Sequence, residues 1–141
     1  MLARRELSEA QVRQRLARKG HEPDAIDEAV TRLLGERALD DTRVAEAIAR
    51  TETTIRRRGK ARVRLQIERA GIAKSTARHA VDEVFDAIDG EAHIEASLKK
   101  RLRGRDTIAD DREFQRLFRY LLGQGFETDQ VMKTLTARRR R

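Results

Sequence analysis

Two runs of basic residues are the parts of this sequence that are best suited to chemistry with a partner. The first spans residues 56–64 and the second spans residues 99–105, and neither contains an acidic residue. Guanidinium and ammonium groups neutralise phosphates, so such runs are typical of proteins that bind nucleic acid or an acidic protein surface. The predicted binding residues are Arg56, Arg57, Arg58, Lys60, Arg62, Arg64, Lys99, Lys100, Arg101, Arg103 and Arg105.

A solvated helix face, paired with the many Asp and Glu residues, is the alternative interpretation of either run. The matching position of the runs in two repeats, described below, favours one basic stripe. Arg57, Arg58 and Lys60 flank Gly59 at a helix break, where we expect their side chains to reach solvent. No aromatic residue interleaves either run, so we expect contacts with the nucleic-acid backbone that are blind to base sequence.

Constellations for catalysis or for metal binding are weak. His79 and Glu83 lie four residues apart, but no third ligand is evident, and an exposed pair explains them better. The pairs Asp40-Asp41 and Asp110-Asp111 each precede a predicted helix, where N-capping accounts for them. No glycine pattern forms a phosphate loop. We therefore expect no enzyme activity, no metal and no cofactor.

Composition narrows the class of protein. The 141 residues carry a net charge of +8, 40% are charged, 4% are aromatic and none is cysteine. Disulfides and thiolate metal sites are thereby excluded. No apolar run approaches the roughly 20 residues of a membrane span, and no signal-peptide core is present. We expect a cytoplasmic monomer that does not bind membranes.

One helix-pair pattern occurs three times along the chain. A stripe with apolar residues four apart ends at a glycine and is followed by a second stripe. The first stripes are Val12-x3-Leu16-x3-Gly20, Val63-x3-Ile67-x3-Gly71 and Leu117-x3-Leu121-x3-Gly125. The spacings of 51 and 54 residues indicate tandem repeats, with each glycine as a helix C-cap.

The repeats predict an all-α protein with three helices each in units two and three, and two helices plus a stub in unit one. We expect unit one at 1–40, with a truncated first helix, unit two at 41–90, and unit three at 91–141 with an Arg-rich tail. Neighbouring units must share their cores, because units of this size bury little apolar surface alone.

Local signals predict where the helices begin and end. Ser8 to Gln11 forms a capping box, and Pro23 occupies the first turn of the next helix. We expect Asp41 to cap a long helix with Val44, Ile48, Thr51 and Ile55 on one face. Gly90 is expected to terminate a helix that starts at Ser75.

Two further features complete the third unit. Phe114, Phe118, Leu121 and Leu122 are expected in its core, with a partner groove as the alternative. The residues Arg138–Arg141 are expected to be a disordered end that adds non-specific attraction, with a solubilising or neutral role as the alternative.

Four segments with recognisable motifs follow one another over nearly the whole chain. The first two are Leu2-Ala3-Arg4-Arg5-Glu6-Leu7-Ser8 and Leu39-Asp40-Asp41-x-Arg43-Val44-Ala45. The next two are Arg57-Arg58-Gly59-Lys60-Ala61-Arg62-Val63 and Gly125-Phe126 with Asp129 and Val131. This ordered set resembles the RecX family, bacterial regulators of the RecA recombinase. The resemblance implies a fold of three tandem three-helix units in a curved, elongated array.

The resemblance implies a protein that binds the RecA–DNA filament. Such a protein limits filament growth and, with it, ATP hydrolysis, strand exchange and repressor cleavage. The resemblance brings no catalytic residues. A free-standing, non-specific nucleic-acid-binding protein is the alternative, and it differs in needing no RecA.

Overall fold

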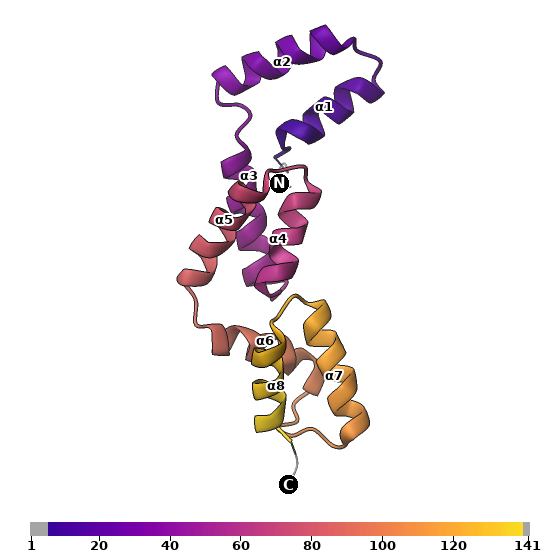
Figure 1. The fold of residues 1–141 in the computed structure, drawn as a ribbon, viewed down its shortest axis with the longest axis vertical. Helices are drawn as coiled ribbons and strands as arrows, with labels where there is room; N and C mark the ends of the chain where they lie inside the picture. The colour runs from indigo at the N-terminus through magenta and orange to yellow at the C-terminus, as the bar shows by residue number, and fades with distance from the viewer. Residues whose placement is uncertain (1–5, 140–141) are drawn as a thin grey trace.

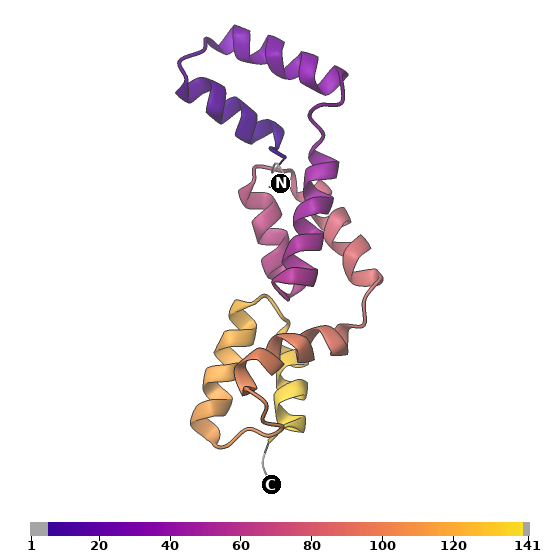
Figure 2. The same cartoon turned by 180° about the vertical axis from the view of Figure 1, so that it is seen from behind.

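The computed structural model describes residues 6–139, and this part of the chain is all-α, as predicted. The helices stack along one axis into a curved, elongated array (Figures 1 and 2). Within the described residues, Ile108 and Arg139 form an isolated parallel β-bridge. The elements are α1 (Glu9–Arg18), α2 (Pro23–Gly35), α3 (Asp41–Arg50), the π-helical turn η1 (Thr51–Ile55), α4 (Lys60–Arg69), α5 (Lys74–Asp86), α6 (Gly90–Leu102), α7 (Asp111–Gly123) and α8 (Thr128–Ala137).

Three glycines end the repeated helices α1, α4 and α7, as predicted. Gly20, Gly71 and Gly125 have φ of 89°, 83° and 99°. Residues with a side chain rarely adopt this left-handed conformation, which turns the chain away from the helix axis. At the other end of α1, the predicted capping box of Ser8 and Gln11 is present.

Two of the predicted helix boundaries are wrong. Asp40, not Asp41, caps α3, because its side chain accepts hydrogen bonds from the backbone amides of the first turn. The carboxylate of Asp41 instead accepts from the Glu9 amide at 2.9 Å. Gly90 begins α6 and does not terminate α5, because the Asp89 side chain caps the α6 N-terminus.

The prediction of one long helix from Asp41, with four residues on one apolar face, is also wrong for the second half of that helix. Val44 is buried and Ile48 packs against the core, as predicted. The chain then forms the π-helical turn η1, which inserts an extra residue into the helical repeat. Thr51 and Ile55 are thereby rotated out of the apolar face, and Ile55 is 69% exposed.

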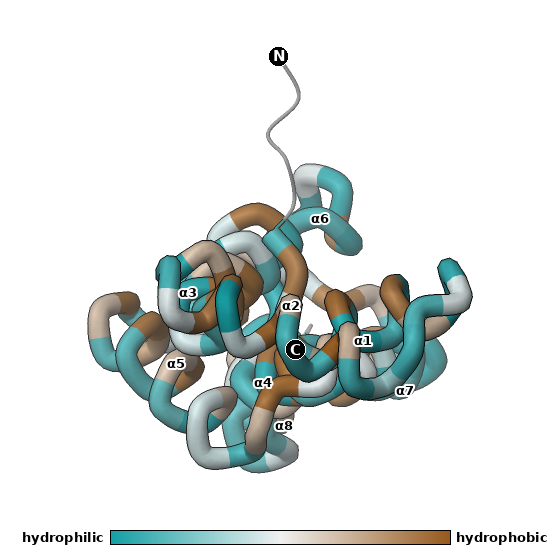
Figure 3. Tube along the Cα trace, turned by 90° about the horizontal axis from the view of Figure 1, so that it is seen from above, coloured by the Kyte–Doolittle hydropathy of each residue, from teal (hydrophilic) through white to brown (hydrophobic). Residues whose placement is uncertain are grey.

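Buried apolar residues form three separate clusters that follow one another along the chain. The first contains Ile26, Val30 and Leu39. The second contains Val44, Ala45, Ala49, Val63, Ile67, Ala70, Ile72, Ala77, Ala80 and Val81. The third contains Ile94, Leu98, Leu102, Ile108, Phe114, Leu117, Leu121, Phe126, Val131 and Leu135. Seen along the long axis of the molecule, most of the outer helical turns are hydrophilic (Figure 3).

The stripe on α7 packs mostly into the third cluster. Phe114 and Leu121 are buried and Phe118 is partly buried against them, as expected for a core stripe. Leu122 differs, because it is 36% exposed at the outer edge of the helix.

The C-terminal arginines that the structure describes are packed against unit three. Arg138 binds the carboxylate of Glu95 and the Asp106 carbonyl, and Arg139 binds Asp111. The expectation of a disordered end is therefore wrong for Arg138 and Arg139. Arg140 and Arg141, like residues 1–5, lie outside the described part of the chain.

The three glycine-terminated helices α1, α4 and α7 run along the same side of the molecule (Figures 1 and 2). Two of the glycine turns also receive the start of another helix. In the first joint, the start of α1 packs on the turn at Gly71, and Ser8 Oγ donates to the Ala70 carbonyl. In the second joint, the start of α4 packs on the turn at Gly125. Each joint connects one apolar cluster to the next.

Candidate functional site

The first basic run lies where η1 ends and α4 begins, beside the second joint. Arg56, Arg57, Lys60 and Arg64 are exposed. Two of these charges have acidic neighbours, because Arg56 lies 3.6 Å from Glu52 and Lys60 lies 3.9 Å from Asp82. The Lys60–Asp82 pair is exposed and contributes little to stability, and the Arg56 side chain is itself 59% exposed, so both basic groups remain available to a partner.

Arg58 corrects the expectation that the residues beside Gly59 reach solvent. Its side chain is 16% exposed and its Nη1 lies 3.2 Å from both carboxylate oxygens of Glu52. Glu52 is itself buried, and burying a carboxylate without a paired cation and hydrogen bonds is costly in free energy. Arg58 is therefore part of the fold, although the sequence places it in the middle of the basic run.

Arg62 is likewise tied to the second joint. It is half-buried, and its Nη1 donates to the Gly123 carbonyl at the end of α7, 3.2 Å away. This bond gives a partner to one of the carbonyls that a helix leaves open at its C-terminus. A basic side chain at this position also interacts favourably with the helix dipole.

The second basic run covers the end of α6 and the loop that follows. Lys99, Lys100 and Arg103 are exposed. Arg101 lies over the ring of Tyr120 at 4.1 Å from its centroid. This distance is within the range of a cation–π interaction, which fixes the direction of the guanidinium group.

Arg105 forms the strongest ion pair of this run. Its two terminal nitrogens donate to both carboxylate oxygens of Glu113, at 2.9 and 2.6 Å. The hydrogen bond from Arg105, followed by the Ala109 amide, lowers the pKa of Glu113 to about 2. The same pairing raises the pKa of Arg105. Glu113 is therefore ionised at neutral pH, and it holds Arg105 in one orientation.

Helix α7 contacts both basic runs and connects them along one edge of the array. Glu113 in its first turn binds Arg105, and Tyr120 lies beneath Arg101. Gly123 at its last turn accepts from Arg62. The three α7 residues are spaced by seven and three positions, so they lie on one stripe of the helix. That both runs act together as one binding surface stays a prediction.

Sequence reasoning missed Arg116 and Tyr120 as neighbours of the second run. Together with Arg101, Arg103 and Arg105 they line a cleft of about 320 Å³. The repeat contains a usable signal for Arg116, because it precedes Leu117 as Arg62 precedes Val63. Tyr120 has no such signal, since an aromatic residue on an apolar helix is ordinarily a core residue.

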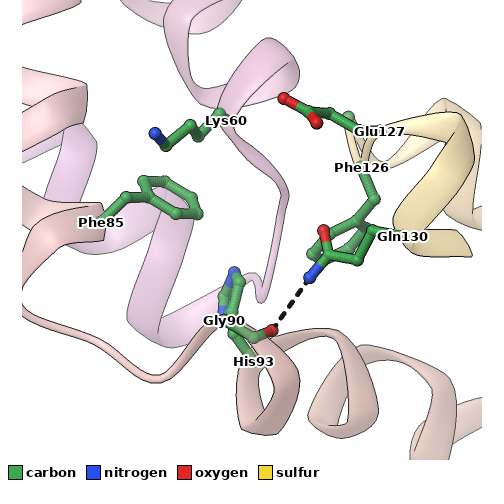
Figure 4. A pocket seen from close by; sticks show the side chains of 8 residues that line it. Lys60, Phe85, Gly90, His93, Phe126, Glu127 and Gln130 are labelled. Carbon is green, nitrogen blue, oxygen red and sulfur yellow. Dashed lines mark hydrogen bonds between the residues drawn. The ribbon is translucent and has the colours of Figure 1, made fainter. Parts of the chain in front are cut away.

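A second missed residue is His93, which lies in the second joint. It is buried, and its Nε2 lies 2.6 Å from the Arg58 carbonyl. Its ring lies between Phe85 and Phe126, with centroids 5.5 Å away from each. Figure 4 shows it next to Gly90 in a pocket of about 220 Å³ that Lys60 also lines and in which Gln130 donates to the Gly90 carbonyl. Burial lowers the pKa of His93.

Metal ligands do not converge anywhere in residues 6–139, since no group of three His, Cys, Asp or Glu side chains is placed to hold an ion. His79 and Glu83 form the exposed pair that their spacing indicated, 3.6 Å apart. In the same part of the chain, no helix is both long and apolar enough to cross a membrane.

An elongated stack of helix pairs defines a helical-repeat protein, a class whose members commonly present an extended surface. Comparison with known proteins identifies the family. The family model for the first three-helix domain of RecX matches residues 1–33. The regulatory protein RecX of Halorhodospira halophila is 31% identical over 97% of this chain and 83% of its own length.

A second relative, the regulatory protein RecX of Syntrophotalea carbinolica, is 32% identical over 89% of this chain and 83% of its own length. The chain therefore belongs to the RecX family. A crystal structure of a regulatory protein RecX superimposes with a TM-score of 0.74 at 19% identity over 93% of this chain. At that identity the likeness shows the fold alone, and the chain spans 64% of the crystallised one.

Proposed function

We propose that this protein binds the RecA–DNA filament and inhibits filament extension. Slower ATP hydrolysis, strand exchange and co-protease activity would follow, because each depends on the extended filament. Membership of a family whose members are named regulatory proteins supports a regulatory role. The proposed partners are RecA and the DNA in the filament. We propose that the protein binds them as a monomer in the cytoplasm.

The observation that carries this proposal is the path of α7 between the two basic runs. A repeat array offers an extended edge, and the contacts of α7 with basic residues from two distant segments support a shared surface along it. Such an edge suits a partner with a repeating negative charge, such as the backbone of a filament-bound DNA strand. A compact partner would require only one of the two runs.

We further propose that the functional units are residues 1–40, 41–90 and 91–141. The three apolar clusters support this division, since each contains residues of one such range. Within the described residues, the first range contains two helices, whereas the second and third contain three α-helices each.

The first experiment measures the DNA-dependent ATPase of RecA on single-stranded DNA with and without a molar excess of this protein. We expect a lower rate and shorter filaments. Unchanged ATPase and filament length at molar excess would contradict the proposal.

A pair of charge reversals locates the interaction on the basic edge. We expect Arg57→Glu with Arg64→Glu to weaken RecA inhibition at least about tenfold, because both side chains are exposed and long-range attraction depends on summed charge. Arg32→Glu with Arg78→Glu is the matched control, since it reverses two exposed arginines on α2 and α5. Equal inhibition by both variants would remove the basic edge from the mechanism.

A free-standing, non-specific nucleic-acid-binding protein is the second candidate, and the same basic edge favours it. The two functions differ in whether RecA is recognised directly. Retention of this protein on immobilised RecA in the absence of DNA supports the first function. Binding to DNA without any retention on RecA supports the second.

A further inference from the structure

The cleft beside α7 carries more positive charge than its own residues neutralise. Arg101, Arg103, Arg105 and Arg116 line it together with one carboxylate, that of Glu113. Four positive charges and one negative charge leave an excess of three. Cations crowded around one carboxylate repel one another unless an anion joins them.

The guanidinium groups of the cleft are held in place by neighbouring side chains. Glu113 holds Arg105 through two bonds and lies 3.4 Å from Arg116. Tyr120 supports Arg101 from beneath. Binding an anion here would therefore require less loss of side-chain freedom than binding at a run of extended arginines.

The backbone between α6 and α7 brings the remaining arginine to the cleft. Arg103 has φ of 50° and Gly104 has φ of 85°, so two successive left-handed residues turn the chain at the end of α6. A residue other than glycine or asparagine is uncommon in this conformation. The turn places Arg103 and Arg105 on the wall of one cleft with Arg116 from α7.

The helix dipole explains only part of this arrangement. Basic residues at the end of α6 interact favourably with the partial negative charge of its C-terminus. Arg116 is different, because it lies inside α7. It shares the carboxylate of Glu113 with Arg105, so it adds a positive charge to the cleft that this one carboxylate does not balance.

We propose that this cleft is a phosphate-binding site that takes one phosphodiester group of the DNA backbone. Planar guanidinium groups bind phosphate oxygens through paired hydrogen bonds, and a group with several oxygens can accept from more than one arginine. The inference rests on the proposed DNA contact and assigns Arg116 to it as a new binding residue. It also makes Arg101 and Tyr120 a fixed pair at the edge of the site.

Tyr120 supplies a local readout of binding. The chain contains one tyrosine and no tryptophan, so its emission under 280 nm excitation reports on this cleft. The probe is an abasic deoxyribose-phosphate oligomer, which has the phosphodiester groups of DNA without the bases that absorb at this wavelength. We expect a saturable change in Tyr120 emission on titration.

The deciding variant is Arg103→Ala with Arg116→Ala, and its matched control is Arg32→Ala with Arg78→Ala. Both remove two exposed arginines, but only the first pair lines the cleft. We expect the cleft variant to bind the oligomer at least about tenfold more weakly and to reduce the salt slope by about 1 to 2. The control should stay within about threefold of the parent, and thermal melts confirm that both variants are folded.

The possible failures of this experiment are distinguishable. If the parent does not bind a labelled DNA strand by anisotropy, both the DNA contact and the cleft assignment are wrong. If the parent binds DNA but Tyr120 emission does not change, or if both variants weaken binding equally, only the cleft assignment is wrong. Inorganic phosphate at constant ionic strength tests the source of the group, because equal affinity for free phosphate and the oligomer would overturn the DNA assignment.

Discussion

The first and second joints place the start of one helix on the glycine turn of another, but different atoms make the connection. In the first joint, the hydroxyl of Ser8 donates to the Ala70 carbonyl. In the second joint, Gly59 takes the place of Ser8, and its backbone amide donates to the Gln124 carbonyl at 2.8 Å. Both residues are helix N-caps, so a side-chain donor in one joint corresponds to a main-chain donor in the other.

The difference follows from how closely the two backbones approach. A Cβ on Gly59 would lie 2.5 Å from the Gly125 carbonyl carbon, so only glycine fits at that contact. The Ala61 amide also reaches the Gly125 carbonyl, at 3.2 Å. The contact of Gly59 with Gly125 thus brings main chain against main chain, whereas in the first joint the Ser8 side chain makes the bond.

The largest effect is expected from Gly125→Ala. The new Cβ would lie 2.9 Å from Arg62 Cα and closer still to its amide nitrogen, at a backbone φ of 99°. Overpacking and left-handed strain together predict a loss of about 3 kcal/mol or more in the free energy of unfolding, measured by urea denaturation.

Gly20→Ala is the matched control for this effect. Gly20 has φ of 89° but no atom within 4 Å of an added Cβ. It should therefore show the strain without the clash, a loss of about 1 kcal/mol. Equal losses at the two glycines would mean that the second joint yields easily and is not closely packed.

The next largest effect is expected from Arg58→Glu, which places two carboxylates together in the second joint. Removing the cation from buried Glu52 should lower the free energy of unfolding by about 3 kcal/mol. Arg57→Glu is the comparison. The Arg57 side chain is exposed, so this substitution should change the free energy of unfolding by no more than about 0.5 kcal/mol. Similar thermal melts for the two variants would contradict the structural role of Arg58.

The contrast between Arg57 and Arg58 shows which properties the sequence predicts. The helix periodicity and the glycines predict the all-α repeat fold, because both depend on neighbours within a few residues. The exposure of Arg58 depends on Glu52, which the π-helical turn η1 rotates inward. No local pattern predicts that turn, so a basic run that looks uniform divides into partner-facing and fold-stabilising residues.

The candidate site divides in the same way. The sequence predicts both basic runs, and the repeat alignment of Arg62 with Arg116 would have extended them to α7. The burial of His93 could not be predicted, because it depends on Phe85 from α5 and Phe126 from the loop between α7 and α8. Contacts between units have no period in the sequence, whereas contacts within a helix do.

A smaller effect is expected from Ser8→Ala, which removes the side-chain donor of the first joint. The hydroxyl caps α1 and also binds the Ala70 carbonyl, so its loss should lower the free energy of unfolding by about 1 to 2 kcal/mol. Ser75→Ala is the control, since Ser75 is exposed and does not cap α5. Hydrogen exchange of the α1 amides should increase in the first variant only, and unchanged exchange would mean that the joint does not depend on this hydroxyl.

The smallest effect is expected from pH, and it should act on the second joint alone. Burial lowers the pKa of His93 below its ordinary 6.5; the bond to the Arg58 carbonyl opposes this shift and the charge of Arg57 adds to it. Lys60 and Glu127 also line the pocket. As pH falls below 6.5, the unfolded chain gains a proton that the folded chain resists, so stability is complete above this pH and decreases below it. Urea denaturation should therefore give a lower free energy of unfolding at about pH 5.5 than at about pH 7.5.

His93→Gln separates this residue from every other titrating group. An amide can still donate to the Arg58 carbonyl, but it gains no proton in this range, so the variant should lose the difference between the two pH values. Hydrogen exchange shows where in the molecule the pH acts. Lowering the pH should speed exchange in α6 of the parent and leave exchange in α1 unchanged, because the first joint contains a hydroxyl group whereas the imidazole of His93 lies at the second. If the variant keeps the full pH dependence, or if α1 responds as strongly as α6, then the two joints do not differ in the way that their atoms indicate.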